Sequence, residues 1–110
     1  MARLDEIVTW CDQTTERVGF PDYPGACNGL QIENLGEVRR IGASVDASLE
    51  AFEMAVRANV DFLIVHHGPF WGKPVPLTGA NYRKFKFALD RNLAVYGSHL
   101  PLDAHARIGN

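Results

Sequence analysis

The segment 60–71 contains a continuous apolar run, residues 62–65, which is followed by two adjacent histidines and a Gly-Pro turn. An unbroken apolar run of this length is typical of a strand that is buried on both faces. Such strands belong to parallel sheets whose faces are covered by helices, so the run favours an α/β fold. Ligands of open parallel sheets bind beyond the carboxyl ends of the strands. The run therefore places His66 and His67 at the edge of the sheet where ligands bind.

The rest of the chain alternates helices with strands. Apolar residues at helical spacing predict a helix over 3–18 that ends at Gly19. Strands over 38–45, 62–65 and 93–98 then alternate with helices over 49–59 and 81–91. We predict one α/β domain over 1–110. It is a small three-layer βαβαβ unit with parallel strands and right-handed crossovers, and the N-terminal helix packs on the sheet.

Local signals refine this prediction at several points. Ser48 is the expected N-cap of the helix that follows it. In the helix over 81–91, the side chains of Tyr82, Phe85 and Leu89 are expected to face inward. The segment 28–32 is predicted to be a loop that ends in a short extended piece, because Asn-Gly favours a turn.

A sheet of three parallel strands has two open edges, which intact proteins usually cover. We therefore expect the chain to be part of a longer protein or to rely on a partner.

Composition excludes several classes of protein. A net charge of -2 over 110 residues gives no reason to expect nucleic acid or an anionic membrane as a partner. No apolar stretch approaches the ~20 residues of a membrane span, and the N-terminus has no signal-peptide pattern, so a cytoplasmic location is expected. Cys11 and Cys27 form no close-spaced metal or redox motif. Cys11 is expected to be a small core residue, and a disulfide between the two stays open.

Polar side chains follow the end of each predicted strand. Asp46 follows the first, His66 and His67 follow the second, and His99 and Asp103 follow the third. Because the carboxyl ends of parallel strands meet at one edge of a sheet, these side chains are expected to converge there.

Neutral imidazole is the commonest metal ligand among side chains. Adjacent residues of a regular strand point to opposite faces, but at a strand end both histidines can face the same edge. The arrangement predicts one imidazole for each of two nearby ions, with Asp103 bridging them through its two oxygens. Two such ions would activate a water for hydrolysis. Nitrogen and oxygen ligands without thiolate suit zinc, iron, manganese or cobalt.

Each candidate also has a structural interpretation. The paired His66 and His67 are suited to capping backbone carbonyls. His99 fits a position behind the metal ligands, or in the core, better than a direct ligand. Asp103 is a possible turn former after Pro101, and Asp46 is more typical of a turn or cap than of a ligand.

Three other groups of residues have a structural and a functional interpretation. His105 is most simply a surface residue. Phe70 and Trp71 fit packing better than a substrate platform. Four cations are available to an anionic substrate, although exposed charge is the simpler interpretation: Lys73, Arg83, Lys84 and Lys86.

Four stretches of the chain resemble the N-terminal half of the NIF-three-like dinuclear-metal proteins, also called GTP cyclohydrolase I type 2 homologs. They are 28–31, 42–48, 64–71 and 96–105, and they occur in family order over almost the whole chain. The double histidine together with His-Leu-Pro-Leu-Asp is the specific part of this resemblance. It implies that the chain is half of a larger family fold.

The resemblance implies that His66, His67 and Asp103 are ligands of a dinuclear metal centre. Two further family ligands, from a His-x-x-x-Glu motif, are not in this sequence. His99 would orient ligands or shuttle protons. The resemblance also implies assembly into a toroidal hexamer, so a homo-oligomer is expected.

The family name implies hydrolytic attack on the guanine ring of GTP, and a small molecule or nucleotide is the expected substrate. No glycine-rich phosphate loop is present, however. The resemblance therefore favours a metal-dependent hydrolase. The alternatives are a non-enzymatic metal-binding regulatory or scaffold protein, and a shortened chain with no activity of its own.

Overall fold

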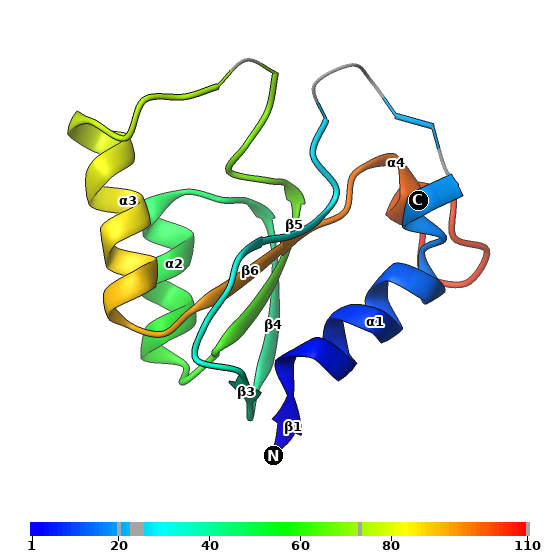
Figure 1. The fold of residues 1–110 in the computed structure, drawn as a ribbon, viewed down its shortest axis with the longest axis horizontal. Helices are drawn as coiled ribbons and strands as arrows, with labels where there is room; N and C mark the ends of the chain where they lie inside the picture. The colour runs from blue at the N-terminus through cyan, green and yellow to red at the C-terminus, as the bar shows by residue number, and fades with distance from the viewer. Residues whose placement is uncertain (20, 23–25, 73, 110) are drawn as a thin grey trace.

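The computed structural model describes residues 1–19, 21–22, 26–72 and 74–109. Its elements follow one another along the chain as β1 (Ala2–Arg3), α1 (Leu4–Thr14), the 3-10 turn η1 (Arg17–Gly19), β2 (Gly29–Ile32), β3 (Glu37–Val38), β4 (Ile41–Asp46), α2 (Leu49–Arg57), β5 (Phe62–His67), α3 (Gly79–Asp90), β6 (Ala94–Gly97) and α4 (Leu100–Asp103). Helices α2 and α3 cover one side of the main sheet and α1 covers the other, which gives the three predicted layers (Figure 1). The α/β class and the N-terminal helix packed on the sheet are therefore confirmed.

The main sheet has four strands in the order β2-β6-β5-β4. β4 and β6 run parallel to the central β5, as predicted, because helical crossovers join the three strands. The expectation of three strands with two open edges was wrong at one edge. The segment 28–32, predicted to be a loop that ends in a short extended piece, forms β2, which pairs with β6 in antiparallel orientation.

Two apolar clusters fill the space between the layers. On the α2–α3 side, Leu63 and Val65 of the sheet pack with Phe52, which is completely buried. On the α1 side, Phe62 and Tyr96 pack against the helix. Among the described residues, no helix is long and apolar enough to cross a membrane.

Helix ends differ from the prediction where the backbone departs from helical angles. α1 ends at Thr14 instead of Val18, and Glu16 then adopts a left-handed backbone with φ 53°. The predicted cap of α2 is confirmed, because the Ser48 hydroxyl accepts the N–H of Ala51 at 3.1 Å. The first strand of the crossover starts at Ile41, three residues later than predicted, because β3 uses Val38 to pair with β1.

The inward face of α3 was predicted correctly only at Phe85. The side chains of Tyr82 and Leu89 are exposed by 52% and 63%, whereas Phe85 and Ala88 are buried in the core. The helix is therefore rotated relative to the prediction, so that the small Ala88 faces the sheet.

Cys11 lies in the α1-side cluster, as expected of a small core residue. Burial raises the pKa of its thiol to about 11. Cys27 is exposed, and the structure has no disulfide between the two cysteines.

Replacement of Tyr96 by phenylalanine tests the α1 side of the core. The buried Tyr96 hydroxyl donates to Asp12 at 2.6 Å, and burial together with this bond raises the pKa of the phenol. Because Tyr96→Phe removes a hydrogen bond to a charged group, we expect a loss of about 1–2 kcal/mol in the free energy of unfolding, measured in urea. The exposed Tyr82→Phe is the control, with a change within about 0.5 kcal/mol. Equal stability of both variants would contradict this role of Asp12.

Candidate metal centre

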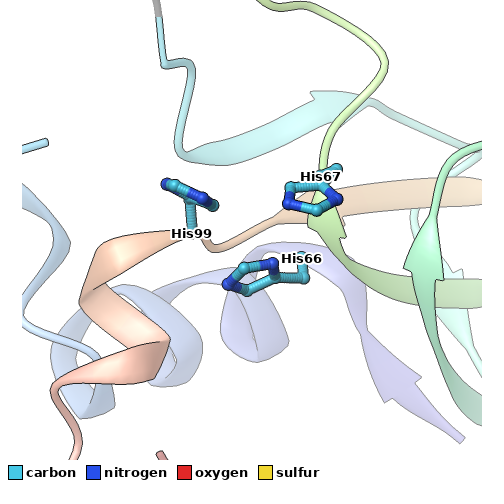
Figure 2. Close-up of side chains that lie close together, drawn as sticks. All are labelled: His66, His67 and His99. Atoms are coloured by element: carbon cyan, nitrogen blue, oxygen red, sulfur yellow. The ribbon is translucent and has the colours of Figure 1, made fainter. Parts of the chain in front are cut away.

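Three imidazoles gather at the carboxyl edge of the sheet (Figure 2). His66 and His67 end β5, and His99 follows β6 just before α4. Each histidine offers a ring nitrogen, and these three atoms lie within 4.8 Å of one another. The structure thus places all three side chains where the sequence predicted a convergence.

The two adjacent histidines reach the same place although both belong to a strand. β5 pairs with β4 as far as Asp46 opposite His67, beyond the predicted end at Val65. The ring centroids of His66 and His67 are 4.6 Å apart with a 60° tilt, and that of His99 is also 4.6 Å from that of His66. The end of the strand therefore allows neighbouring rings to face one space.

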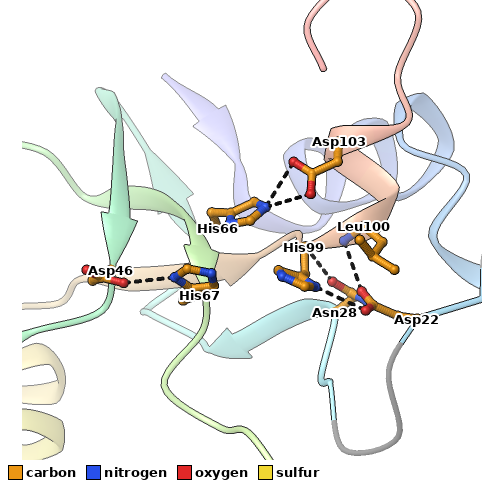
Figure 3. A network of polar contacts seen from close by, with 8 residues as sticks. All are labelled: Asp22, Asn28, Asp46, His66, His67, His99, Leu100 and Asp103. Atoms are coloured by element: carbon orange, nitrogen blue, oxygen red, sulfur yellow. Dashed lines mark hydrogen bonds and ion pairs between the residues drawn. The ribbon is translucent and has the colours of Figure 1, made fainter. Parts of the chain in front are cut away.

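Each imidazole contacts an aspartate (Figure 3). Nε2 of His66 lies 3.0 and 3.1 Å from the two Asp103 oxygens. Nδ1 of His67 is 2.9 Å from Asp46, and Nδ1 of His99 is 3.0 Å from Asp22. Carboxylates that bond one ring nitrogen fix the orientation and tautomer of a ligating histidine. The pairs are His66–Asp103, His67–Asp46 and His99–Asp22.

The three pairs differ in burial. The His99–Asp22 pair is the most buried, with 13% and 6% of the side chains exposed, and the His67–Asp46 pair lies at the surface, with 51% and 71% exposed. The His66–Asp103 pair lies between them. The orientation of the imidazole ring is therefore most constrained at His99 and least constrained at His67.

Asp22 is the residue that sequence reasoning missed. Its second oxygen accepts the N–H of Leu100 at 2.9 Å and the side-chain amide of Asn28 at 3.1 Å. The carbonyl oxygen of that same amide accepts the N–H of His99 at 2.8 Å. Asn28, predicted only as a turn former, thus helps to hold the start of α4 and the imidazole of His99.

Gln31 links the segment before β2 to the loop that follows β5. Its amide oxygen accepts the N–H of Phe70 at 3.3 Å, and its amide nitrogen donates to the carbonyl of Cys27. A Cβ at Gly68 or Gly97 would fall within 3 Å of the Gln31 amide. The two glycines therefore leave the space that this amide occupies beside the end of β5.

The remaining candidate residues either pack in the core or lie near the three imidazoles. Phe70 packs on the core and stacks with Phe85, with ring centroids 5.0 Å apart. Trp71 is 42% exposed, and its ring centroid is 4.9 Å from that of His99. His105 lies outside the three-histidine cluster, and its Nδ1 accepts the N–H groups of Arg107 and Ile108. Asp46 contacts His67 and is thus more than a turn residue.

Three of the four cations considered for an anionic substrate lie on α3. Lys86 pairs with Asp90 at 2.7 Å on the exposed face of α3, and Lys84 lies over the Phe85 ring. Arg83 is exposed on the same helix, and Lys73 lies outside the described residues. The simpler interpretation of exposed helix charge therefore describes the α3 cations.

A cavity of about 400 Å³ opens beside His66 on the α1 side of the sheet. Its lining is mostly apolar, and the described lining residues include no lysine or arginine. They are Ala43, Ser44, Val45, Ile64, Val65, His66 and Leu102. Among the described residues, this cavity accordingly offers no side-chain cation to a phosphate group.

The donor set fits a divalent transition metal. Zinc–nitrogen bonds are about 2.0–2.1 Å long, so the nitrogens of one ion lie within about 4 Å of each other. Ring nitrogens within 4.8 Å need only small side-chain adjustments to reach that spacing. Imidazole nitrogen and carboxylate oxygen without thiolate are typical ligands of zinc, iron, manganese and cobalt.

A mostly parallel sheet between helices, with imidazoles and carboxylates at its carboxyl edge, defines an α/β protein with a candidate metal centre. The family model Duf34/NIF3 (NGG1p interacting factor 3) matches residues 2–110. The chain belongs to this family.

Relatives of the chain support this assignment. It is 42% identical over 106 residues to the GTP cyclohydrolase 1 type 2 homolog of Deinococcus radiodurans, a match that covers 96% of this chain and 40% of the relative. The homolog of Archaeoglobus fulgidus is also 42% identical, over 97% of this chain and 43% of its own length. The chain thus spans about two fifths of the length of these curated relatives.

Solved structures show the same fold. TTHA1606 from Thermus thermophilus superimposes with a TM-score of 0.93 at 44% identity, over 98% of this chain and 44% of that chain. Reduced HcgD from Methanocaldococcus jannaschii superimposes with a TM-score of 0.81 at 27% identity, over 93% and 41%.

Proposed function

We propose that this chain binds divalent metal ions through His66, His67 and Asp103, with His99 completing the cluster. The observation that carries the proposal is the convergence of three imidazoles within 4.8 Å beside a carboxylate 3.0 Å from His66. The residues present would hold two ions of zinc, iron, manganese or cobalt, with His66, His67 and Asp103 as their ligands.

The reaction that this centre suits best is metal-dependent hydrolysis. When bound, such ions polarise a substrate oxygen and lower the pKa of a water. Asp46 orients the ring of His67 through Nδ1, and Asp22 does the same for His99. His99 is placed to hold a proton at Nδ1 against Asp22, while its ring lies beside the ligands. The relatives named GTP cyclohydrolase 1 type 2 homolog support a nucleotide-like substrate.

The proposal includes a cytoplasmic location, which the two free thiols support.

Fluorescence of Trp71 provides a test of metal binding in the intact chain. Trp71 lies against His99, whereas Trp10 is exposed on α1. Because paramagnetic Co²⁺ quenches a nearby indole, Trp10→Phe, which keeps Trp71, is expected to be quenched saturably. The matched Trp71→Phe variant keeps only Trp10 and is expected to stay bright.

Adding His66→Ala and His67→Ala to the Trp10→Phe variant is expected to abolish the quenching. Equal quenching of the two single-tryptophan variants, or quenching that survives loss of both histidines, would refute the proposed site.

The second candidate function is a non-enzymatic metal-binding regulatory or scaffold protein. The cavity beside His66 favours it, because none of the described side chains that line it would neutralise the phosphates of GTP. Incubating the Mn²⁺- or Zn²⁺-loaded chain with GTP and simple phosphoesters separates the two functions. Turnover that needs the metal and disappears in Asp103→Ala supports the hydrolase. Metal binding without any turnover supports the scaffold.

A further inference from the structure

β4 is an edge strand whose outer side meets no other strand among the described residues. The carbonyl of Arg40 accepts the N–H groups of Asp61 and Phe62 and therefore faces β5. Backbone groups of successive strand residues face opposite edges. The N–H and C=O groups of Ile41, Ala43 and Val45 consequently point away from the sheet, where a further strand would bond them.

The side chains of the same three residues form an exposed apolar strip. Ile41 is 51% exposed and Val45 is 63% exposed. Ile41 and Ala43 pair in register with Phe62 and Ile64, whose side chains belong to the α1-side core. The strip of Ile41, Ala43 and Val45 thus continues that core beyond the area that α1 covers, and a stable fold gains by burying it.

The sequence of β4 is self-complementary when it is paired with itself in antiparallel orientation. With Ala43 on a two-fold axis, Ile41 lies opposite the partner's Val45, and Arg40 lies opposite the partner's Asp46. Residues 41, 43 and 45 then exchange backbone hydrogen bonds, in agreement with the direction of their free groups.

Opposite charges directly across two strands stabilise their pairing. Asp46 has this capacity, because His67 contacts only one of its oxygens and the side chain is 71% exposed. A shift of two residues would keep the backbone pattern but would separate Arg40 from Asp46.

We propose that β4 pairs with β4 of a second copy of this chain in this register, which gives a two-fold dimer with one continuous eight-stranded sheet. The family resemblance implies an oligomer but no particular contact, whereas this contact follows from the free edge, the apolar strip and the charges of β4. A two-fold contact uses the same surface on both copies, as a self-complementary strand requires. The competing explanation is that a segment of a longer polypeptide covers β4. In that case the 110-residue chain is expected to stay monomeric in the tests below.

Sedimentation of the full 110-residue chain tests the apolar part of the contact. We expect wild type to sediment as a dimer of the 12.2 kDa chain. Val45→Asp, which puts a charge into the strip, is expected to sediment as a monomer. Val18→Asp alters another valine that is 85% exposed but lies far from β4 in the sequence, and it is expected to stay dimeric. A wild type that stays monomeric at millimolar concentration, or equal behaviour of the two variants, would overturn the proposal.

Mixing two charge variants tests the register and does not depend on Val45. Arg40→Glu alone sets Glu opposite Asp46 twice, and Asp46→Arg alone sets Arg opposite Arg twice, so each is expected to be monomeric. Mixed together, they restore two opposite-charge pairs and are expected to form a heterodimer in native mass spectrometry. Circular dichroism spectra verify that both variants are folded. Folded variants that fail to form a heterodimer when mixed would refute this register, as would a homodimer of either variant alone.

Discussion

Replacing Asp22 by alanine is expected to lower the free energy of unfolding by about 3 kcal/mol in metal-free buffer. The side chain is 6% exposed and accepts hydrogen bonds from the described residues Asn28, His99 and Leu100. Removing it leaves three donors without this acceptor in a buried site, and each such donor costs about 1–3 kcal/mol before the structure relaxes. Urea unfolding followed by circular dichroism measures the change.

Asp46→Ala is the matched control for this prediction. It also removes an aspartate from a histidine pair, but Asp46 is 71% exposed and its pair is open to solvent. A surface pair of this kind contributes between about 0 and 1 kcal/mol. If Asp22→Ala were no more destabilising than Asp46→Ala, burial of the Asp22 network would not be what holds α4 and His99 in place.

Replacing His66 by alanine is expected to weaken Co²⁺ binding by about 100-fold or more. The reason is that His66 contacts both neighbouring rings and Asp103, so its loss removes a ligand from the middle of the centre. Loss of a residue that merely supports a ligand already costs about 10–100-fold in affinity, and Asp22→Ala is expected to fall in that range through His99. Isothermal titration calorimetry measures these affinities.

His105→Ala is the control, because it removes the one histidine outside the cluster. Its affinity for Co²⁺ is expected to equal that of wild type. If His105→Ala weakened binding as much as His66→Ala does, the ion would be held at another position.

Much of the fold was predictable because the strongest signals were local. The apolar run of β5 and the cap at Ser48 depend on residues close to one another in the sequence. The convergence of Asp46, His66 and His99 then follows from strand direction alone, since parallel strands share one edge.

Features that depend on distant pairing were not predictable. β2 is four residues long and is stabilised by β6, more than sixty residues away, while its Asn-Gly start favours a turn. Asp22 lies next to Pro21 in a stretch without periodicity, and only the folded chain brings it to His99 and Leu100. The orientation of α3 was mistaken because Ala88 carries little hydrophobic signal, although its side chain is completely buried in the core.

A crystal of the chain grown with Co²⁺ or Zn²⁺ tests the central claim most directly. Anomalous difference maps from data collected at the X-ray absorption edge of the metal are expected to show ions in contact with His66, His67 and Asp103, with His99 alongside. A map with no peak between these side chains at saturating metal, or with its peaks only at other histidines, would contradict the metal centre.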